Sequence, residues 1–283
     1  MVDLFERAIK KFEDGVTSHK TASGRRSWKS AGVAPQSPEY SLDFAKLKMQ
    51  GFLTPGSVEG RTAEEYRIIK RLLLMNAFGK GVPKVERGNS IVVTSALAGE
   101  GKTFTSLNLA ISIAQEKDST VLLIDADLTK RSLSRFFGAG SAKGLTDLLS
   151  DTQLDIGEVI GRTNVEKLRF IPAGPEMTNA TELLASEQME DLVSELMHRY
   201  EDRIILFDSA PLLLTSQAVV ITQLVGQVVM VVEEGRTSHS VIREAVSQID
   251  DEKMVGMVLN RCSGSKGSSS YGGYYGPIES GSD

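Results

Sequence analysis

The chain contains 283 residues, of which 41% are hydrophobic, and it carries a formal net charge of −5. A mildly acidic chain has no overall attraction for nucleic acid, so we expect no nucleic-acid partner. Its one cysteine, Cys262, excludes an internal disulfide framework and fits a reducing compartment. No segment reaches the roughly 18 apolar residues that span a bilayer, and the N-terminus does not resemble a secretory signal. These features predict a cytoplasmic protein.

The N-terminal part of the chain falls into two segments. Residues 1–15 place Phe5, Ile9 and Phe12 at helical spacing, which predicts a short amphipathic helix. Residues 16–59 are rich in Ser, Gly, Pro, Lys and Arg and show little apolar periodicity. Because such a composition buries little apolar surface, it predicts a flexible basic linker.

Residues 60–262 have the pattern of one α/β domain. A helix capped by Thr62 is predicted over "AEEYRIIKRLLLMNAF", with Tyr66, Ile69, Leu72 and Leu73 among its apolar positions. Six short apolar runs then predict strands: "SIVVTSA", "TVLLIDAD", "LRFIPAG", "RIILFDSA", "QVVMVVEE" and "MVGMVLN". Between them lie helical patterns at 103–115, 181–200 and 238–249. Because uniformly apolar strands are buried on both faces, we predict a doubly wound, mostly parallel α/β sheet flanked by helices, of the P-loop NTPase type.

The segment "SALAGEGKTF" follows the first of these strands and precedes a helix. Glycines let backbone N–H groups turn toward a phosphate, a lysine can reach the β- and γ-oxygens, and a threonine hydroxyl can ligate Mg²⁺. The strict pattern G-x-x-x-x-G-K-[ST] has glycine where this chain has Ala96. We expect the loop to bind ATP through six residues, Gly99, Glu100, Gly101, Lys102, Thr103 and Phe104.

Three aspartates end two of the later strands. Asp125 and Asp127 follow "VLLI", and Asp208 follows "IILF". Because the carboxyl ends of parallel strands share one edge of the sheet with the phosphate loop, these carboxylates are expected to converge near the phosphates. Carboxylates gathered there imply a bridging Mg²⁺. The alternative interpretation is that each aspartate only caps a helix or begins a turn.

Half of the chain's six tyrosines lie in the C-terminal residues 263–283, namely Tyr271, Tyr274 and Tyr275. The surrounding Gly and Ser predict a disordered tail. A mobile tail lets a phenol reach a nucleotide site at little strain, so these tyrosines are candidate phosphoacceptors. The alternative is a low-complexity tail whose tyrosines have no such role or bind a partner by stacking.

The segments "AGEGKT", "VLLIDADLTK", "GLTDLL", "ELLAS", "IILFDSAPLLLTS", "VGQVVMVVE" and "GMVLN" occur in this order. Over residues 60–275 the chain thereby resembles the bacterial tyrosine kinases that act on exopolysaccharide synthesis. The resemblance implies an ATP- and Mg²⁺-dependent autokinase that phosphorylates its C-terminal tyrosines in trans. It further implies a role in regulating polysaccharide synthesis, chain length or export.

The same resemblance implies roles for individual residues. The catalytic set would be Lys102, Asp125, Asp127 and Asp208, in which Asp125 is the candidate to accept the tyrosine proton. Mg²⁺ would be held by Thr103, Asp127 and Asp208, directly or through water. In "VLNRC", Asn260 would lie beside the adenine with Arg261 nearby, unless Asn260 only ends its strand.

Family members also carry a Glu-x-x-Arg-x-x-Arg helix for ring-like self-association. Glu64, Arg67 and Lys70 match it, with lysine in the last position. A lysine cannot reproduce the bidentate contact of a guanidinium group, which weakens the expectation of a ring. The resemblance further implies a membrane-embedded chain-length or export protein as activator, recruitment to the inner face of the membrane, and a cognate tyrosine phosphatase.

Two other functions fit the same fold. An ATP-driven switch of the plasmid-partition type would carry a lysine early in the phosphate loop, where this chain has Leu97. That difference and the tail tyrosines favour a kinase. A non-catalytic nucleotide-binding scaffold is left open by Ala96 and Ala210, which depart from the usual motifs.

Overall fold

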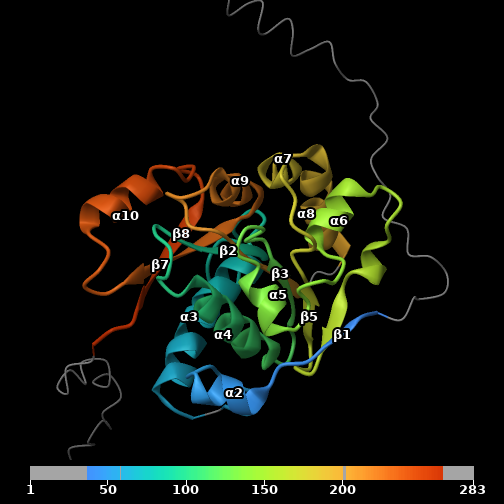
Figure 1. The fold of residues 1–283 in the computed structure, drawn as a ribbon. Coiled ribbons are helices and arrows are strands. Elements are labelled where there is room, and N and C mark those ends of the chain that lie inside the picture. The colour runs from blue at the N-terminus through green and yellow to red at the C-terminus, as the bar shows by residue number, and fades with distance from the viewer. Residues whose placement is uncertain (1–36, 58, 200–201, 264–283) are drawn as a thin grey trace, which may run out of the picture.

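The computed structural model describes residues 37–57, 59–199 and 202–263 (Figure 1). These residues form one eight-stranded sheet with the strand order β1-β4-β5-β3-β6-β2-β7-β8. The strands are β1 (Glu39–Tyr40), β2 (Ser90–Ser95), β3 (Thr120–Asp125), β4 (Gly161–Thr163), β5 (Leu168–Ile171), β6 (Arg203–Asp208), β7 (Gln227–Glu233) and β8 (Met254–Asn260). Within the described sheet, β4 and β5 pair antiparallel and all other neighbours pair parallel. The predicted doubly wound, mostly parallel sheet is confirmed.

Helices cover both faces of this sheet, as Figure 1 shows. On one face lie α2 (Phe44–Met49), α3 (Arg61–Phe78), α4 (Lys102–Ala114) and α5 (Ser132–Phe136). On the other lie α6 (Leu145–Ser150), α7 (Ala180–Leu184), α8 (Glu187–Arg199), α9 (Ser216–Leu224) and α10 (His239–Val246). A short 3₁₀ turn spans Ile156–Glu158. Among the described helices, none combines the length and the apolar character needed to cross a membrane.

Successive strand residues enter two separate cores. Ile91 and Val93 of β2 belong to the core beneath α3 and α4, whereas Val92 between them belongs to the core on the other face. All three are fully buried. Since both faces are covered, a side chain is buried whichever way it points, which explains the uniformly apolar strands.

The edge strand β8 departs from this pattern. Three of its large apolar side chains, Met254, Met257 and Leu259, are 45–57% exposed. Among the described strands, β8 pairs only with β7 and none lies beyond it. The expectation that the run "MVGMVLN" is buried on both faces is therefore wrong, although its predicted bounds match those of β8.

The predicted linker over 16–59 is wrong for residues 37–57, which belong to the fold. The side chain of Asn164 bonds both the N–H and the C=O of Leu42 at 2.9 Å, and Asn108 Oδ1 accepts the N–H of Leu53 at 2.7 Å. Four apolar side chains of this segment are buried: Tyr40, Leu42, Leu47 and Leu53. These partners come from 55 and 122 positions away, so local periodicity gives no sign of them. The predicted N-terminal helix and the tail lie outside the described residues.

Two predicted helix boundaries also differ. α3 begins directly after Gly60, whose φ is 109°, and no side chain caps it, so Thr62 is not its N-cap. The helix predicted over 181–200 is two helices, α7 and α8. The break comes at Ser186, whose hydroxyl accepts the N–H of Met189 at 3.3 Å and so begins α8 with a capping bond.

Candidate functional site

The phosphate loop joins the carboxyl end of β2 to the start of α4. Gly99 and Gly101 have φ values of 86° and 99°, a region that disfavours residues with a Cβ. A Cβ at Gly101 would also collide with the side-chain amide of Asn260. Ala96, which replaces the first glycine of the strict pattern, is fully buried in the core beneath α9, so its methyl group is accommodated.

The side chain of Glu100 bonds to groups that surround the loop. One carboxylate oxygen accepts the N–H of Leu97 at 2.6 Å, and the other accepts the hydroxyl of Thr237. The Asn260 amide donates to the Glu100 carbonyl at 2.8 Å. Asn260 therefore does more than end β8, because its nitrogen is committed to the phosphate loop. Arg261, expected beside the nucleotide, pairs with Glu233 at 2.8 Å.

The structure brings together the five side chains expected at the phosphates: Lys102, Thr103, Asp125, Asp127 and Asp208. Asp125 and Asp208 are direct partners across β3 and β6. The Thr103 hydroxyl donates to Asp208 Oδ2 at 2.8 Å. Burial lowers the pKa of Lys102, although the negative charges of Asp208 and Asp127 nearby partly offset this shift.

The aspartates also shape the backbone, as the alternative interpretation proposed. Asp127 Oδ1 accepts the N–H of Lys130 at 2.9 Å, which holds the turn after β3. Asp125 Oδ2 accepts both the N–H and the hydroxyl of Ser134, at 2.8 and 2.7 Å. This backbone role is compatible with the predicted role at the phosphates, because in each carboxylate these bonds use only one of the two oxygens.

Burial raises the pKa of two of these carboxyls. For Asp125 the pKa rises to about 7, first through desolvation and then through the charge of Asp208, against the Ser134 bonds that lower it. For Asp208 desolvation raises the pKa to about 6, although bonds from Thr103 and Ser106 and the charge of Lys102 lower it. The site therefore holds acids that titrate near neutral pH.

The oxygen groups at this edge fit Mg²⁺. The Thr103 hydroxyl and the Asp208 carboxylate are hard oxygen donors within contact of each other. Within the described residues, no three His, Cys, Asp or Glu side chains converge closely enough to hold a metal by themselves. Mg²⁺ is usually bound through one or two carboxylates together with substrate phosphates.

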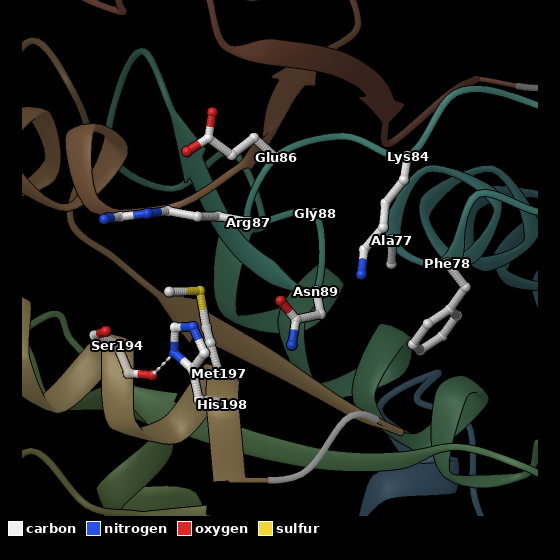
Figure 2. A pocket seen from close by; sticks show the side chains of 10 residues that line it. All are labelled: Ala77, Phe78, Lys84, Glu86, Arg87, Gly88, Asn89, Ser194, Met197 and His198. Atoms are coloured by element: carbon white, nitrogen blue, oxygen red, sulfur yellow. Dashed lines mark hydrogen bonds between the residues drawn. The ribbon is translucent and has the colours of Figure 1, made fainter.

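The described residues line a cavity at each end of the central strands. One of ≈ 530 Å³ is bounded by α3 and β8 and is lined in part by Phe104, Asn260 and Arg261. The other, of ≈ 630 Å³, lies before β2, where Lys84 and Asn89 face the end of α8 at His198 (Figure 2). The larger cavity contains none of the residues expected to bind the nucleotide, whereas the smaller one contains Phe104, Asn260 and Arg261.

The helix α3 only partly fits its predicted role in self-association. Glu64 and Arg67 are exposed and form an ion pair with each other. Lys70 is instead buried, where it donates to the Ser112 carbonyl at 2.9 Å and pairs with Glu116 at 2.6 Å. Lys70 is therefore not available as a surface contact, because it occupies the buried stripe of α3 against α4.

Three residues that the sequence analysis did not single out contact the site: Ser106, Ser134 and Thr237. The Ser106 hydroxyl donates to Asp208 Oδ1 at 2.9 Å, and it lies one turn after Thr103, a spacing that could have revealed it. The other two come from loops and a short helix, where the sequence carried no signal. The tail tyrosines lie outside the described residues.

Comparisons with known proteins identify the family of this chain. Residues 88–252 match the family model of the AAA domain. Tyrosine-protein kinase CpsD of Streptococcus agalactiae is 32% identical over 220 residues, covering 76% of this chain and 90% of that protein. Tyrosine-protein kinase YwqD of Bacillus subtilis is 31% identical over 216 residues, covering 76% and 86%. The crystal structure of the VpsO kinase domain superposes with a TM-score of 0.61 at 29% identity, covering 78% of this chain and 100% of that one. The chain belongs to the bacterial tyrosine-protein kinase family.

Proposed function

We propose that this kinase transfers the γ-phosphoryl group of MgATP to Tyr271, Tyr274 and Tyr275 of a neighbouring copy. The observation that carries the proposal is the convergence of a P-loop lysine, the Thr103–Asp208 hydrogen bond and two further aspartates at one edge of the sheet. Phosphoryl transfer requires positioning and charge neutralisation more than covalent chemistry, and this arrangement provides both.

The nucleotide would lie along the loop and into the neighbouring cavity. Backbone N–H groups of the loop and the Lys102 ammonium would hold the β- and γ-phosphates, and Thr103, Asp127 and Asp208 would hold the metal, directly or through water. Bound Mg²⁺ would neutralise the phosphate charge. The cavity between α3 and β8 is lined by Phe104, by Asn260 and by a mixture of apolar and charged side chains, which suits a purine base with its polar edge.

Asp125 would accept the proton of the tyrosine hydroxyl. Its Oδ2 is fixed by Ser134, and its Oδ1 is buried without a partner. Its pKa of about 7 is close to the operating pH, as a general base requires. Because a tyrosine has a pKa near 10, the proton would leave during transfer and not before it.

Self-association and partners complete the proposal. Glu64 and Arg67 lie on the same exposed surface of α3 as Ile68 and Leu72, which are 57% and 59% exposed. This surface would form the ring-like contact between copies. A membrane-embedded chain-length or export protein would recruit and activate the cytoplasmic kinase at the membrane, and a tyrosine phosphatase would reverse the reaction. The output would be regulation of exopolysaccharide synthesis, chain length or export.

A mixing experiment tests the central step. A full-length Asp208→Ala chain, which keeps its tail, is combined with an otherwise wild-type chain that ends at Ser263. Radiolabelled ATP and Mg²⁺ are added, and phosphotyrosine is identified by mass spectrometry. Label on the tail of the Asp208→Ala chain supports transfer in trans. Release of phosphate without labelled tyrosine would instead support the switch ATPase and contradict the proposal.

A further inference from the structure

The turn between β7 and α10, residues 234–238, contacts the phosphate loop through two consecutive residues, Arg236 and Thr237. The guanidinium group of Arg236 donates to the Ala98 carbonyl at 3.1 Å, and the Thr237 hydroxyl donates to the Glu100 carboxylate. The turn is itself anchored, because Arg236 pairs with Glu233 at 2.8 Å. Glu233 in turn pairs with Arg261 at the end of β8.

Glu100 is the link between this turn and the loop. It is fully buried, and the described structure gives its carboxylate two hydrogen-bond donors, the Leu97 N–H and the Thr237 hydroxyl. A buried carboxylate that loses one of two donors carries an uncompensated desolvation cost. The contact with Thr237 therefore matters more to the loop than an exposed hydrogen bond would.

A phosphate loop needs such external support. Its N–H groups must converge on one point, and in the absence of an anion those parallel dipoles do not stabilise one another. Gly99 and Gly101, both at positive φ, give this segment further conformational freedom. Any conformational freedom that the loop has without a ligand must be lost on binding, which weakens affinity for the ligand.

We propose that Thr237 is a positioning residue of the nucleotide phosphate site, which acts through the Glu100 carboxylate to preform the loop. Asn260 and Arg236 secure the neighbouring carbonyl groups of the same loop from outside. The inference rests on the proposed function only in taking this loop as the phosphate site. It assigns to the turn after β7 a role in nucleotide affinity that is separate from the transfer step.

Substitution of Thr237 tests the proposal in the full-length chain. Thr237→Val removes the hydroxyl but keeps the volume, whereas Thr237→Ser keeps the hydroxyl. Since a hydrogen bond to a buried charge is at stake, Thr237→Val should weaken MgADP binding in calorimetry and raise the KM for ATP by about tenfold, with kcat within about twofold. Thr237→Ser should restore wild-type values. Thr222→Val is the matched control, because in the described part of the chain this buried hydroxyl bonds only to the Val219 carbonyl within α9.

A double-mutant cycle with Glu100→Gln tests the route of the effect. If Thr237 acts through Glu100, the variant that combines Thr237→Val with Glu100→Gln should bind MgADP no more weakly than whichever single variant binds it less tightly. Wild-type affinity in Thr237→Val, failure of Thr237→Ser to restore it, or independent additive effects would overturn the proposal. Lys102→Met separates the failure of the proposed phosphate site from the failure of the positioning role. If Lys102→Met binds MgADP as tightly as wild type, the loop is not the phosphate site. If Lys102→Met loses MgADP binding while Thr237→Val binds as tightly as wild type, only the positioning role of Thr237 is refuted.

Discussion

The hydroxyl of Thr103 donates a 2.8 Å hydrogen bond to Oδ2 of Asp208, across 105 positions of the sequence. This bond joins the first turn of α4 to the carboxyl end of β6, and the Ser106 hydroxyl occupies the other Asp208 oxygen. The two groups proposed as metal ligands are thus held together before any ligand is bound. Preorganised ligands of this kind lower the cost of assembling a metal-phosphate complex.

The first prediction concerns this pair. Thr103→Val should lower tyrosine phosphorylation by about a hundredfold, because a metal ligand is lost at the point where charge develops. Thr103→Ser, which keeps the hydroxyl, should stay within a few-fold of wild type. Initial rates of phosphotyrosine formation at saturating MgATP provide the measurement. Equal activity of the Val and Ser variants would show that the hydroxyl plays no part in the reaction.

The second prediction concerns pH and stability. The pKa of Asp125 lies near 7 in the folded chain, above its ordinary 3.8, so the native state binds more protons between these values. The stabilisation associated with this proton is complete below about pH 4 and is lost as the pH rises through about 7. From acid to alkaline pH, the free energy of unfolding of wild type should fall because the buried Asp125 carboxyl ionises. Asp125→Asn cannot ionise at this position, so its free energy of unfolding should fall by less, the difference being up to about 4 kcal/mol.

Urea unfolding at about pH 5 and about pH 8, without nucleotide or Mg²⁺, samples the upper part of this range, where the difference should reach about 2–3 kcal/mol. Asp118→Asn, at an exposed position, serves as the control. Parallel pH profiles for wild type and Asp125→Asn would contradict the assignment. In the kinase assay, wild-type activity should rise as the pH passes about 7, because only the ionised carboxylate can accept a proton.

A third prediction separates the residues of α3. Lys70→Met should lower the free energy of unfolding by about 1–2 kcal/mol, because the Ser112 carbonyl and Glu116 lose a buried partner. Arg67→Ala, on the exposed surface, should change stability by less than about 0.5 kcal/mol but weaken self-association. Urea unfolding and analytical ultracentrifugation provide the two measurements. The reverse result, with Lys70→Met altering only assembly, would restore Lys70 as a surface contact.

The fourth prediction tests whether residues 37–57 belong to the domain. Leu47 is 2% exposed in the core beneath α2, so Leu47→Ala should cost about 2–4 kcal/mol. Met49, two residues later and 82% exposed, is the matched control, and Met49→Ala should cost less than about 0.5 kcal/mol. Equal unfolding midpoints for the two variants would mean that the segment acts as a linker after all.

The sequence by itself determined six of the eight described strands, five of them inside the sheet and β8 at its edge, and the loop that follows the first of them. Strands buried on both faces are apolar at every position, so their signal is local and needs no knowledge of neighbours. The convergence of Asp125 and Asp208 could be deduced in the same way, because carboxyl ends of parallel strands must share an edge. Which oxygen contacts Thr103 or Ser134 could not be read from the sequence.

Only the tertiary structure decided the burial of Lys70, the exposure of β8, the folding of residues 37–57 and the support of Glu100 by Thr237. Each depends on partners distant in the sequence: Ser112 and Glu116 for Lys70, and Asn108 and Asn164 for the N-terminal segment. Hydrophobic periodicity reports how a residue relates to its own helix or strand. It does not report which group of another element will meet a buried charge or an unpaired backbone amide, since that is fixed only when the elements pack together.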